Sequence, residues 1–524
     1  MSLYGGRPRL PNRINREGGV PSRRRASSPA RAPRRPPRGP RTRRPAPRLP
    51  GSLARASTGL VSRYCGGTLS FEQRVPGRLG GDTQPRRALD PSTVGRPLQR
   101  DARLDYARPG RRDRIKLHSG RRSRPVSADD THDRRLRECK RRLAAGEADT
   151  DAVVLFPGSN LQYLTGFDED PGERHLLLFV TPETHALLCP ELYEEQVLAE
   201  TTLGREHLRV WSDADDPRAA TAATAEAVGV ADADRVLVDE RLWTRFALDL
   251  RAVMPDAKLA LATELLGDLR IRKDDDELDR LRAVAEVTDE VSRAVRELDP
   301  TGWTERELAR EIEARLLEGG CTGPSFETIV GSGPNGARPH HSHGDRTIEP
   351  GDPVVLDFGG RLAGYPSDQT RTVVWGDDPP ERFREVHRVV REAQRRAVET
   401  VEPGVPAAAV DRAAREVVAD AGYGERFVHR TGHGVGLDVH EPPYVTGEND
   451  RELEPGMVFS VEPGVYLADA FGVRIEDLVV VTEDGHERLN DSSRDWQAAG
   501  WSRGSPASGW RGRSPPTTSW RRSR

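Results

Sequence analysis

The 524-residue chain is poor in cysteine, in lysine and in long apolar runs. Its four cysteines, Cys65, Cys139, Cys189 and Cys321, are scattered and form no CxxC pair, which argues against a disulfide framework and against a thiolate zinc site. No apolar run approaches the roughly 18 residues that cross a bilayer, and the N-terminus has no apolar signal segment. We therefore expect a cytoplasmic protein that is neither membrane-embedded nor secreted by a standard signal.

Lysine occurs only four times among 81 Lys and Arg residues, and the formal net charge of −2 hides segments of opposite sign. Residues 1–130 carry 32 Lys and Arg against 9 Asp and Glu, whereas residues 131–490 carry 42 against 72. Such an acidic excess repels itself unless salt screens it, so the pattern favours a halophilic core. GC-rich codon usage is the alternative for the missing lysine, but it does not explain the excess acid.

Arg- and Pro-rich sequence occupies both ends of the chain. Residues 1–130 contain "RRRASSPARAPRRPPRGPRTRRPAPRLPG", and they offer too little apolar surface to offset the entropy of ordering. Three interpretations compete: a nucleic-acid-binding arm, an Arg-rich targeting segment, or sequence outside the mature protein because of a start site assigned too early. The similar composition of 491–524 favours the third, and the acidic centre disfavours nucleic-acid binding. We expect both ends to be disordered or spurious.

Two globular segments lie between these ends. Across 131–265, short apolar runs such as "DAVVLF" and "RVLVDE" alternate with helical patterns, which predicts a small α/β domain with a mainly parallel sheet. A long amphipathic helix from residue 271 opens a second domain over 266–490, whose final third is strand-rich. Further helices are predicted at 190–200, 218–230, 381–401 and 406–423. The predicted fold class is α+β.

The segment "PVVLDFGGRLAGYPSDQTRTVVWG" predicts a hairpin with two aspartates. Its midpoint falls between Leu362 and Ala363, which would place Asp357 opposite Asp368. Facing carboxylates repel each other, and a divalent cation between them would remove the repulsion. On this segment alone, a solvated surface pair is an equally good interpretation.

A second pair of carboxylates follows the same pattern. Glu462 in "FSVEPGVYL" and Glu476 in "GVRIEDLVVV" have their midpoint at Asp469, within the turn-like "LADAFG". Glu476 stands beside an apolar run, where a lone charge would be costly to bury. Pairing with a metal ion or with Arg474 would offset that cost.

The Gly-rich segment "HRTGHGVGLDVHEPP" contains His429, His433 and His440. Glycine lets the backbone approach a ligand closely, and imidazole supplies a nitrogen donor for Mn, Co, Fe or Zn. One histidine with four carboxylates is an oxygen-rich donor set. It favours Mn(II) over a structural zinc, with Co, Zn and Fe as alternatives.

Together, "NGARPHH", "DFGGRLAGYPSDQTRT", "TGHGVGLDVHEPP", "SVEPGVYL" and "VRIEDLVVV" resemble the signatures of the pita-bread metallopeptidases, in the aminopeptidase P and prolidase branch. The segment "NLQYLTGFDEDPGERHLLLFV" likewise resembles the creatinase-type N-terminal domain of that branch. The resemblance covers roughly 131–490 and rests on five motifs in the expected order. It implies a pita-bread catalytic domain preceded by a creatinase-type α/β domain.

The resemblance also implies five metal ligands and two substrate-side histidines. It makes Asp368 and Glu476 bridges between two divalent ions, and Glu462 both a ligand and the general base. The remaining ligands would be Asp357 and His433, and the histidines that stabilise the tetrahedral intermediate and the bound proline would be His340 and His440.

Two further residues are assigned to the substrate side. His429 either contacts the substrate or only positions its loop, and Arg474 is expected to orient Asp368 or Glu476. Of the neighbouring residues, we expect His341 and His343 to be solvated and Tyr365 and Tyr466 to be packing residues.

The implied activity is metal-dependent hydrolysis of the bond that precedes proline, in a homodimer whose substrate is a proline-containing peptide. In many prolidases an arginine shortly after the "VHE" histidine holds the free carboxylate of a dipeptide, and here Tyr444 stands at about that position. Its absence favours an Xaa-Pro aminopeptidase over an Xaa-Pro dipeptidase. The alternative from a different class is a non-catalytic module that binds peptide or protein on the same fold.

Overall fold

The structure is a computed structural model that describes residues 128–498. Residues 1–127 and 499–524 lie outside the described residues, so the predictions made for the Arg-rich segment 1–130 and for most of the tail 491–524 stay predictions. Within 128–498, none of the helices has the length and apolar character that a membrane span requires.

The N-terminal domain is built on one six-stranded sheet with the order β4-β3-β2-β1-β5-β6. Its strands are β1 (Ala152–Leu155), β2 (Leu177–Val180), β3 (His185–Pro190), β4 (Leu208–Trp211), β5 (Arg235–Val238) and β6 (Lys258–Leu261). β1, β5 and β6 are parallel, as are β3 and β4, whereas β2 is antiparallel to both of its neighbours. The prediction of a mainly parallel sheet is confirmed, since three of the five strand pairs are parallel. The exception is β2, and the four-residue turn that joins it to β3 is too short for a crossover.

Helices cover this sheet on both faces. They are α1 (Ala128–Ala144), α2 (Ser159–Thr165), α3 (Glu194–Glu200), α4 (Pro217–Ala227), α5 (Thr244–Val253) and α6 (Thr263–Arg270). The side chains of β1 alternate between two cores, since Val153 and Leu155 join one apolar cluster while Ala152 and Val154 join another. This period of two explains why β1 is apolar at every position. The helices predicted at 190–200 and 218–230 are confirmed.

The second domain opens with α7 (Asp275–Arg296), whose start is set by a capping box. The Asp274 side chain accepts a hydrogen bond from the Glu277 backbone, and the Glu277 side chain accepts one from the Asp274 backbone. This reciprocal cap places the helix start four residues after the predicted position at 271. The other helices are α8 (Glu305–Glu318), α9 (Glu381–Glu399) and α10 (Ala407–Asp420), so those predicted at 381–401 and 406–423 are confirmed.

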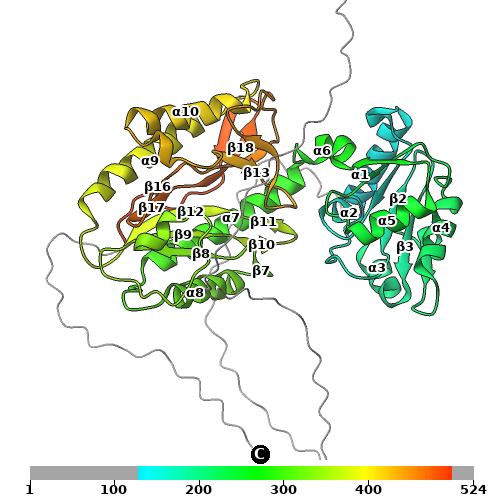
Figure 1. Cartoon of the computed structure of the whole chain (residues 1–524), viewed down its shortest axis with the longest axis horizontal. Helices are drawn as coiled ribbons and strands as arrows, with labels where there is room; N and C mark the ends of the chain where they lie inside the picture. Colours follow the sequence, from blue (N-terminus) through cyan, green and yellow to red (C-terminus); the bar gives the residue numbers. More distant parts are fainter. Residues whose placement is uncertain (1–127, 499–524) are drawn as a thin grey trace, which may run out of the picture. The chain divides into compact units, whose positions relative to one another are not determined.

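The strands of this domain form four small sheets, with the orders β11-β10-β7, β12-β9-β8, β14-β13-β15-β18-β19 and β16-β17. They are β7 (Gly323–Pro324), β8 (Ile329–Ser332), β9 (Pro353–Phe358), β10 (Gly360–Leu362), β11 (Tyr365–Pro366), β12 (Gln369–Val374), β13 (Gly432–Gly434), β14 (Glu441–Val445), β15 (Val458–Val461), β16 (Gly464–Leu467), β17 (Phe471–Arg474), β18 (Asp477–Thr482) and β19 (Gly485–Arg488). Figure 1 shows α9 and α10 along one side of these strands and α8 on the other. The α+β class is confirmed.

Residues just beyond the predicted domain end at 490 also contact this domain. The Val374 backbone donates to Trp496 O at 2.8 Å, and the Ser492 backbone donates to the buried carboxylate of Asp289 at 2.9 Å. The described part of the tail therefore packs against β12 and α7.

Candidate metal centre

Two pairs of carboxylates lie on hairpin strands of the second domain. Val461 pairs with Asp477, and the β16–β17 ladder continues in the same register. This register places Glu462 opposite Glu476 and puts the turn at Asp469, which has a positive φ of 59°. The predicted geometry of the second pair is confirmed.

The first pair differs from the prediction by two residues. Asp357 pairs with Thr370, so Asp368 is two positions out of register rather than directly opposite. The reason is the turn at Ala363 and Gly364, both with positive φ, which lies one residue later than predicted and has the backbone of a two-residue hairpin loop. A shift of two residues keeps side chains on the same face of the ladder. Asp357 and Asp368 therefore still line one cavity, which we call the metal cavity.

β13 brings His433 to the same cavity. A Cβ atom on Gly432 would lie only 1.8 Å from Ser460 O, so glycine permits the close approach of β13 to its neighbour. His433 Nε2 lies 3.6 Å from an Asp368 carboxylate oxygen and 3.4 Å from a Glu462 oxygen. The glycines on either side of this histidine, Gly432 and Gly434, thus permit close contact between strands.

Three of the five predicted ligands form a group that could hold one ion. The donor atoms of Asp368, His433 and Glu476 all lie within 4.8 Å of one another. Asp357 and Glu462 line the same cavity of about 290 Å³, and Asp357 Oδ1 is buried without a hydrogen-bond partner. An orphaned carboxylate oxygen is costly to bury, and a divalent cation would satisfy it. The donor set fits a divalent ion that prefers oxygen and nitrogen ligands.

One buried arginine enters this group of carboxylates. Arg474 donates through Nη2 to Asp357 Oδ2, and through Nη1 to the Tyr466 hydroxyl at 2.8 Å. Its Nε donates to Thr370 Oγ1 at 3.0 Å, and the Thr370 hydroxyl donates to Glu476 Oε2 at 2.6 Å. The prediction that Arg474 orients Glu476 agrees with this chain of bonds. Its direct carboxylate partner is Asp357, which the prediction did not name.

Burial and mutual repulsion raise the pKa values of three carboxyl groups in this cavity, those of Asp368, Glu462 and Glu476. Burial, and next the charge of Glu476, hold the pKa of Asp368 well above its usual range. Burial raises the pKa of Glu462 to about 7 against the opposing effect of Arg474, and it also raises the pKa of Glu476. Burial lowers the pKa of His433 to about 3, so its imidazole stays neutral and can offer a lone pair. One guanidinium does not balance four carboxylates, so the site favours added positive charge.

The histidines predicted on the substrate side line the same cavity. His340 and His440 are exposed at its wall, and the His440 ring centroid lies 4.1 Å from that of His433. His429 is more enclosed, and its Nε2 makes a hydrogen bond of 2.9 Å with the Tyr466 hydroxyl. Tyr466 is buried, as predicted for a packing residue, and its hydroxyl in addition joins His429 to the arginine of the site.

Sequence reasoning missed two hydroxyl side chains that orient ligands. Ser460 Oγ accepts a hydrogen bond from the His433 backbone at 3.1 Å and donates to Glu462 Oε1 at 3.3 Å. The other is Thr370, which bonds to Glu476 as described above. Ser460 and Thr370 each lie two residues from a predicted ligand on the same strand path, which is the period that puts side chains on one face. That spacing was an available signal.

The prediction that His341 and His343 are solvated is also wrong. Both are partly buried, and His341 Nε2 lies 2.8 Å from the Glu305 carboxylate. His343 Nδ1 lies 2.8 Å from Thr328 O. Tyr365 is buried as predicted, and its hydroxyl in addition donates to Glu277 at 2.9 Å.

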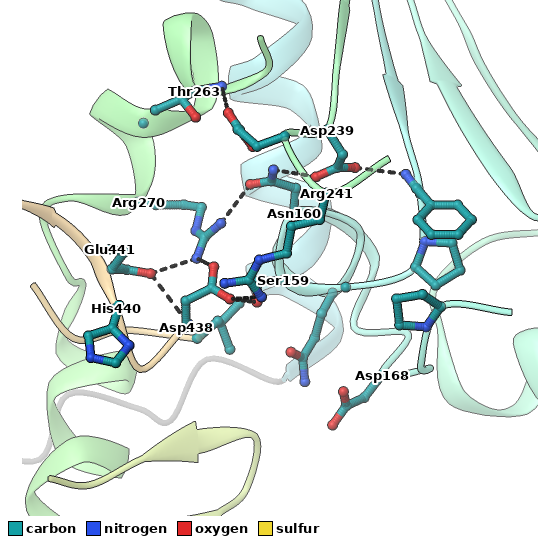
Figure 2. Close-up of a pocket in the computed structure, with 18 of the residues that line it drawn as sticks. Ser159, Asn160, Asp168, Asp239, Arg241, Thr263, Arg270, Asp438, His440 and Glu441 are labelled. Carbon is teal, nitrogen blue, oxygen red and sulfur yellow. Dashed lines mark hydrogen bonds and ion pairs between the residues drawn. The ribbon is translucent and has the colours of Figure 1, made fainter. Parts of the chain in front are cut away.

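A larger cavity of about 710 Å³, which we call the charged cavity, is lined by a second set of charged residues. His440 lines both the charged cavity and the metal cavity. Figure 2 shows Arg270, the last residue of α6, pointing at the carboxylates of Asp438 and Glu441. Its Nη2 lies 2.8 Å from Asp438 and 2.6 Å from Glu441, and Lys273 Nζ lies 2.7 Å from the other Glu441 oxygen. Asp368, Glu462 and Glu476 of the candidate metal centre have no such direct pairing with an arginine or lysine among the described residues.

Comparisons with known proteins agree with this geometry. A model of metallopeptidase family M24 matches residues 279–483, and a model of the creatinase/prolidase N-terminal domain matches residues 135–272. The probable dipeptidase PepE of Mycobacterium tuberculosis is 42% identical over 361 residues, which cover 67% of this chain and 94% of that protein.

Solved structures give the same picture. The prolidase from Thermococcus sibiricus superposes with a TM-score of 0.66 at 38% identity, covering 70% of this chain and 98% of that one. The X-Pro aminopeptidase from Thermotoga maritima superposes with a TM-score of 0.59 at 30% identity, covering 68% and 99%. The chain therefore belongs to metallopeptidase family M24, in its pita-bread branch of aminopeptidase P and prolidase, and carries the creatinase-type N-terminal domain of that branch.

Proposed function

We propose that this protein hydrolyses the peptide bond that precedes proline, with two divalent ions held by Asp357, Asp368, His433, Glu462 and Glu476. The observation that carries the proposal is the charge of the cavity. The four predicted carboxylate ligands and the neutral imidazole of His433 line it, and Arg474 is the one buried cation among the residues that line it. The names of the related proteins, which include a prolidase and an X-Pro aminopeptidase, support proline as the residue after the cleaved bond.

Bound divalent ions would polarise the scissile carbonyl and lower the pKa of the attacking water. Glu462 would accept the proton of that water and return it to the leaving imide nitrogen. His340 and His440, at the wall of the cavity, would donate to the oxygen that becomes negative and pack beside the proline ring. Because a proline amide has no N–H, this wall recognises the shape of the ring rather than a backbone donor.

The metal proposal has its own measurement. We expect the protein, stripped by a chelator and reloaded, to bind two ions per chain, with Mn(II) the best activator and Co(II), Zn(II) or Fe(II) as the alternatives. Elemental analysis of the reloaded protein counts the ions. One ion per chain at full activity would overturn the dinuclear proposal while leaving the peptidase proposal intact.

The proposal also concerns the length of the substrate, which distinguishes an aminopeptidase from a dipeptidase. Tyr444 at the place where many prolidases have arginine supports an aminopeptidase that acts on longer Xaa-Pro peptides. A specific observation supports the dipeptidase as the second candidate: the Arg430 guanidinium lines the metal cavity and stacks over the Tyr444 ring at 4.5 Å. Within residues 128–498 this guanidinium has no carboxylate partner, so it is available to the free carboxylate of a dipeptide.

Hydrolysis of Ala-Pro and Ala-Pro-Ala with added Mn(II) separates the two candidates. An aminopeptidase cleaves the tripeptide at least as well as the dipeptide. If Ala-Pro alone is cleaved, and Arg430→Met raises its KM about 10-fold or more without a matching effect on the Ala-Pro amide, the dipeptidase is correct. Cleavage of neither peptide by metal-loaded protein that still binds them would favour the non-catalytic peptide-binding module.

Three expectations accompany the reaction: a homodimer, a cytoplasmic location and adaptation to salt. The 72 acidic against 42 basic residues of 131–490 support the third. Particle size and activity, both measured in low and in multimolar KCl, test the homodimer and the adaptation to salt. Fractionation of the source cells tests the cytoplasmic location.

A further inference from the structure

The loop that carries His340 runs along the wall of the metal cavity. It follows the short helix η4 (Gly333–Ala337), and its residues from Pro339 to Ser342 line the cavity. The His340 imidazole is exposed and makes no hydrogen bond within residues 128–498. Its place at the cavity is therefore set by the backbone on either side of it.

A buried carboxylate lies behind this loop. Glu305, the first residue of α8, is 0% exposed, and its Oε1 accepts from the Ser332 backbone at 2.8 Å and hydroxyl at 2.7 Å. The Asn335 side chain donates to the same carboxylate at 3.0 Å. These donors belong to β8 and η4, so Glu305 joins the start of α8 to the segment that enters the loop.

The other oxygen of Glu305 binds the loop itself. Its Oε2 lies 2.8 Å from His341 Nε2 and accepts from the Gly344 backbone at 3.2 Å. Burial alone would raise the pKa of Glu305, but the hydrogen bonds from His341 and Ser332 outweigh it and lower that pKa. A carboxylate at a helix N-terminus is also favoured by the helix dipole. Glu305 is therefore a charged acceptor for donors that lie on both sides of the loop.

Further bonds hold the loop on either side of His340. Arg474 Nη1 donates to Pro339 O at 3.2 Å, immediately before His340. After it, His343 Nδ1 lies 2.8 Å from Thr328 O. These bonds hold the loop at points on both sides of His340 and so limit the displacement of its Cα.

We propose that Glu305 is a positioning residue, which acts through His341 to hold His340 at the wall of the metal cavity. The inference rests on the proposed function, because His340 is useful to catalysis only if substrate binds beside it. Misplacement of such a group by about 1 Å costs on the order of 100-fold in rate. Glu305 makes no contact with the metal ligands, so its loss leaves them in place.

Three variants test the proposal. Glu305→Gln keeps the side-chain shape but turns an NH₂ group toward donors that need an acceptor. His341→Phe keeps a ring at a side chain that is 10% exposed and removes only the bond to Glu305, so it remains informative if the first variant folds poorly. Glu307→Gln is the matched control, since Glu307 lies in the same first turn of α8 and bonds only to Thr304.

Two readouts are needed. We expect both Glu305→Gln and His341→Phe to lower kcat about 10- to 100-fold with unchanged metal content, and to speed amide hydrogen exchange in residues 338–345. Glu307→Gln is expected to change neither readout by more than about twofold. In a His340→Ala background, the first two variants should cause no further loss of kcat, because the group that they position is already absent.

Each outcome decides the matter. Unchanged exchange and unchanged kcat in His341→Phe would overturn the proposal. An equal loss of kcat with and without His340 would show that Glu305 acts on stability rather than on His340. If the parent protein cleaves no proline peptide, the proposed function fails on its own, and the exchange of 338–345 still shows whether Glu305 and His341 hold the loop.

Discussion

The metal cavity and the charged cavity of Figure 2 both contain several carboxylates, but they differ in the number of cationic side chains that pair with them. In the second cavity, Arg270 and Lys273 face Asp438 and Glu441 at 2.6 to 2.8 Å. These charges offset the effect of burial, and the pKa of Asp438 is lowered by Arg270 although burial acts against it. Removal of the cation from such a buried pair is destabilising, because it leaves the carboxylate charged and without a partner.

In the metal cavity the balance is missing. Four carboxylates share Arg474, and the pKa of Asp368 is raised by burial first and then by Glu476. The protein therefore stores electrostatic repulsion that a divalent ion would relieve. The comparison shows that buried carboxylates alone do not indicate a metal site, whereas a cluster of buried carboxylates that share one cation favours a bound metal ion.

The largest expected effect is the loss of activity when a predicted ligand of the metal cavity is replaced. Asp357→Asn removes a predicted ligand and leaves the side-chain shape, so we expect proline-peptide hydrolysis to fall on the order of 10³-fold or more. Elemental analysis should show less bound metal. Lys273→Met, which removes a cation beside the charged cavity, should keep its metal. Equal turnover by Asp357→Asn and the parent protein would remove the metal centre from the proposed reaction.

The next largest expected effect is a loss of stability when a cation beside the charged cavity is replaced. Lys273 has a fully buried side chain and shares Glu441 with Arg270. Lys273→Met leaves the buried Glu441 carboxylate with Arg270 as its one remaining ion-pair partner among the described residues, and we expect it to lower the free energy of unfolding by about 3 kcal/mol. Urea unfolding measures this change. A loss of less than about 0.5 kcal/mol would mean that Arg270 alone suffices for Glu441.

A third prediction concerns Asp239, a carboxylate of the charged cavity that has no cationic hydrogen-bond partner among the described residues. Asp239 accepts only from the neutral donors Phe156 N and Asn160 Nδ2, and burial raises its pKa from 3.8 to about 6. A raised folded-state pKa gives stability that is present below pH 3.8 and lost as the pH rises through about 6. We expect the free energy of unfolding to fall by up to about 3 kcal/mol across this window. Asp239→Asn should remove this part of the pH dependence, and an unaltered profile in the variant would contradict the assignment.

The smallest expected effect has the opposite sign to that of Lys273→Met. Because the ionised form of Asp368 is disfavoured in the metal-free protein, Asp368→Asn should raise the free energy of unfolding of that form by about 1 kcal/mol. The same variant should lose the additional stability that the parent protein gains from metal. Thermal unfolding with and without Mn(II) measures both changes. A less stable metal-free variant would mean that the repulsion is already relieved by other groups.

Much of the site could be predicted from local sequence. The turn at Asp469 and the alternation around it placed Glu462 opposite Glu476, because a hairpin register depends on residues close in sequence. The first hairpin was predicted two residues out of register, since Gly364 shifted the turn. The face of the strands was still right, because side chains alternate with a period of two.

Sequence by itself determined the types of the candidate ligands, the strands and helices that carry them, and the family, since apolar periodicity, capping residues and turn glycines act over a few positions. Tertiary structure alone decided which groups meet: Arg474 and Asp357 are 117 residues apart, and Glu305 and His341 are 36 apart. Burial, which depends on the packed core rather than on neighbours in sequence, then determined which carboxylates are neutralised and which still favour a cation.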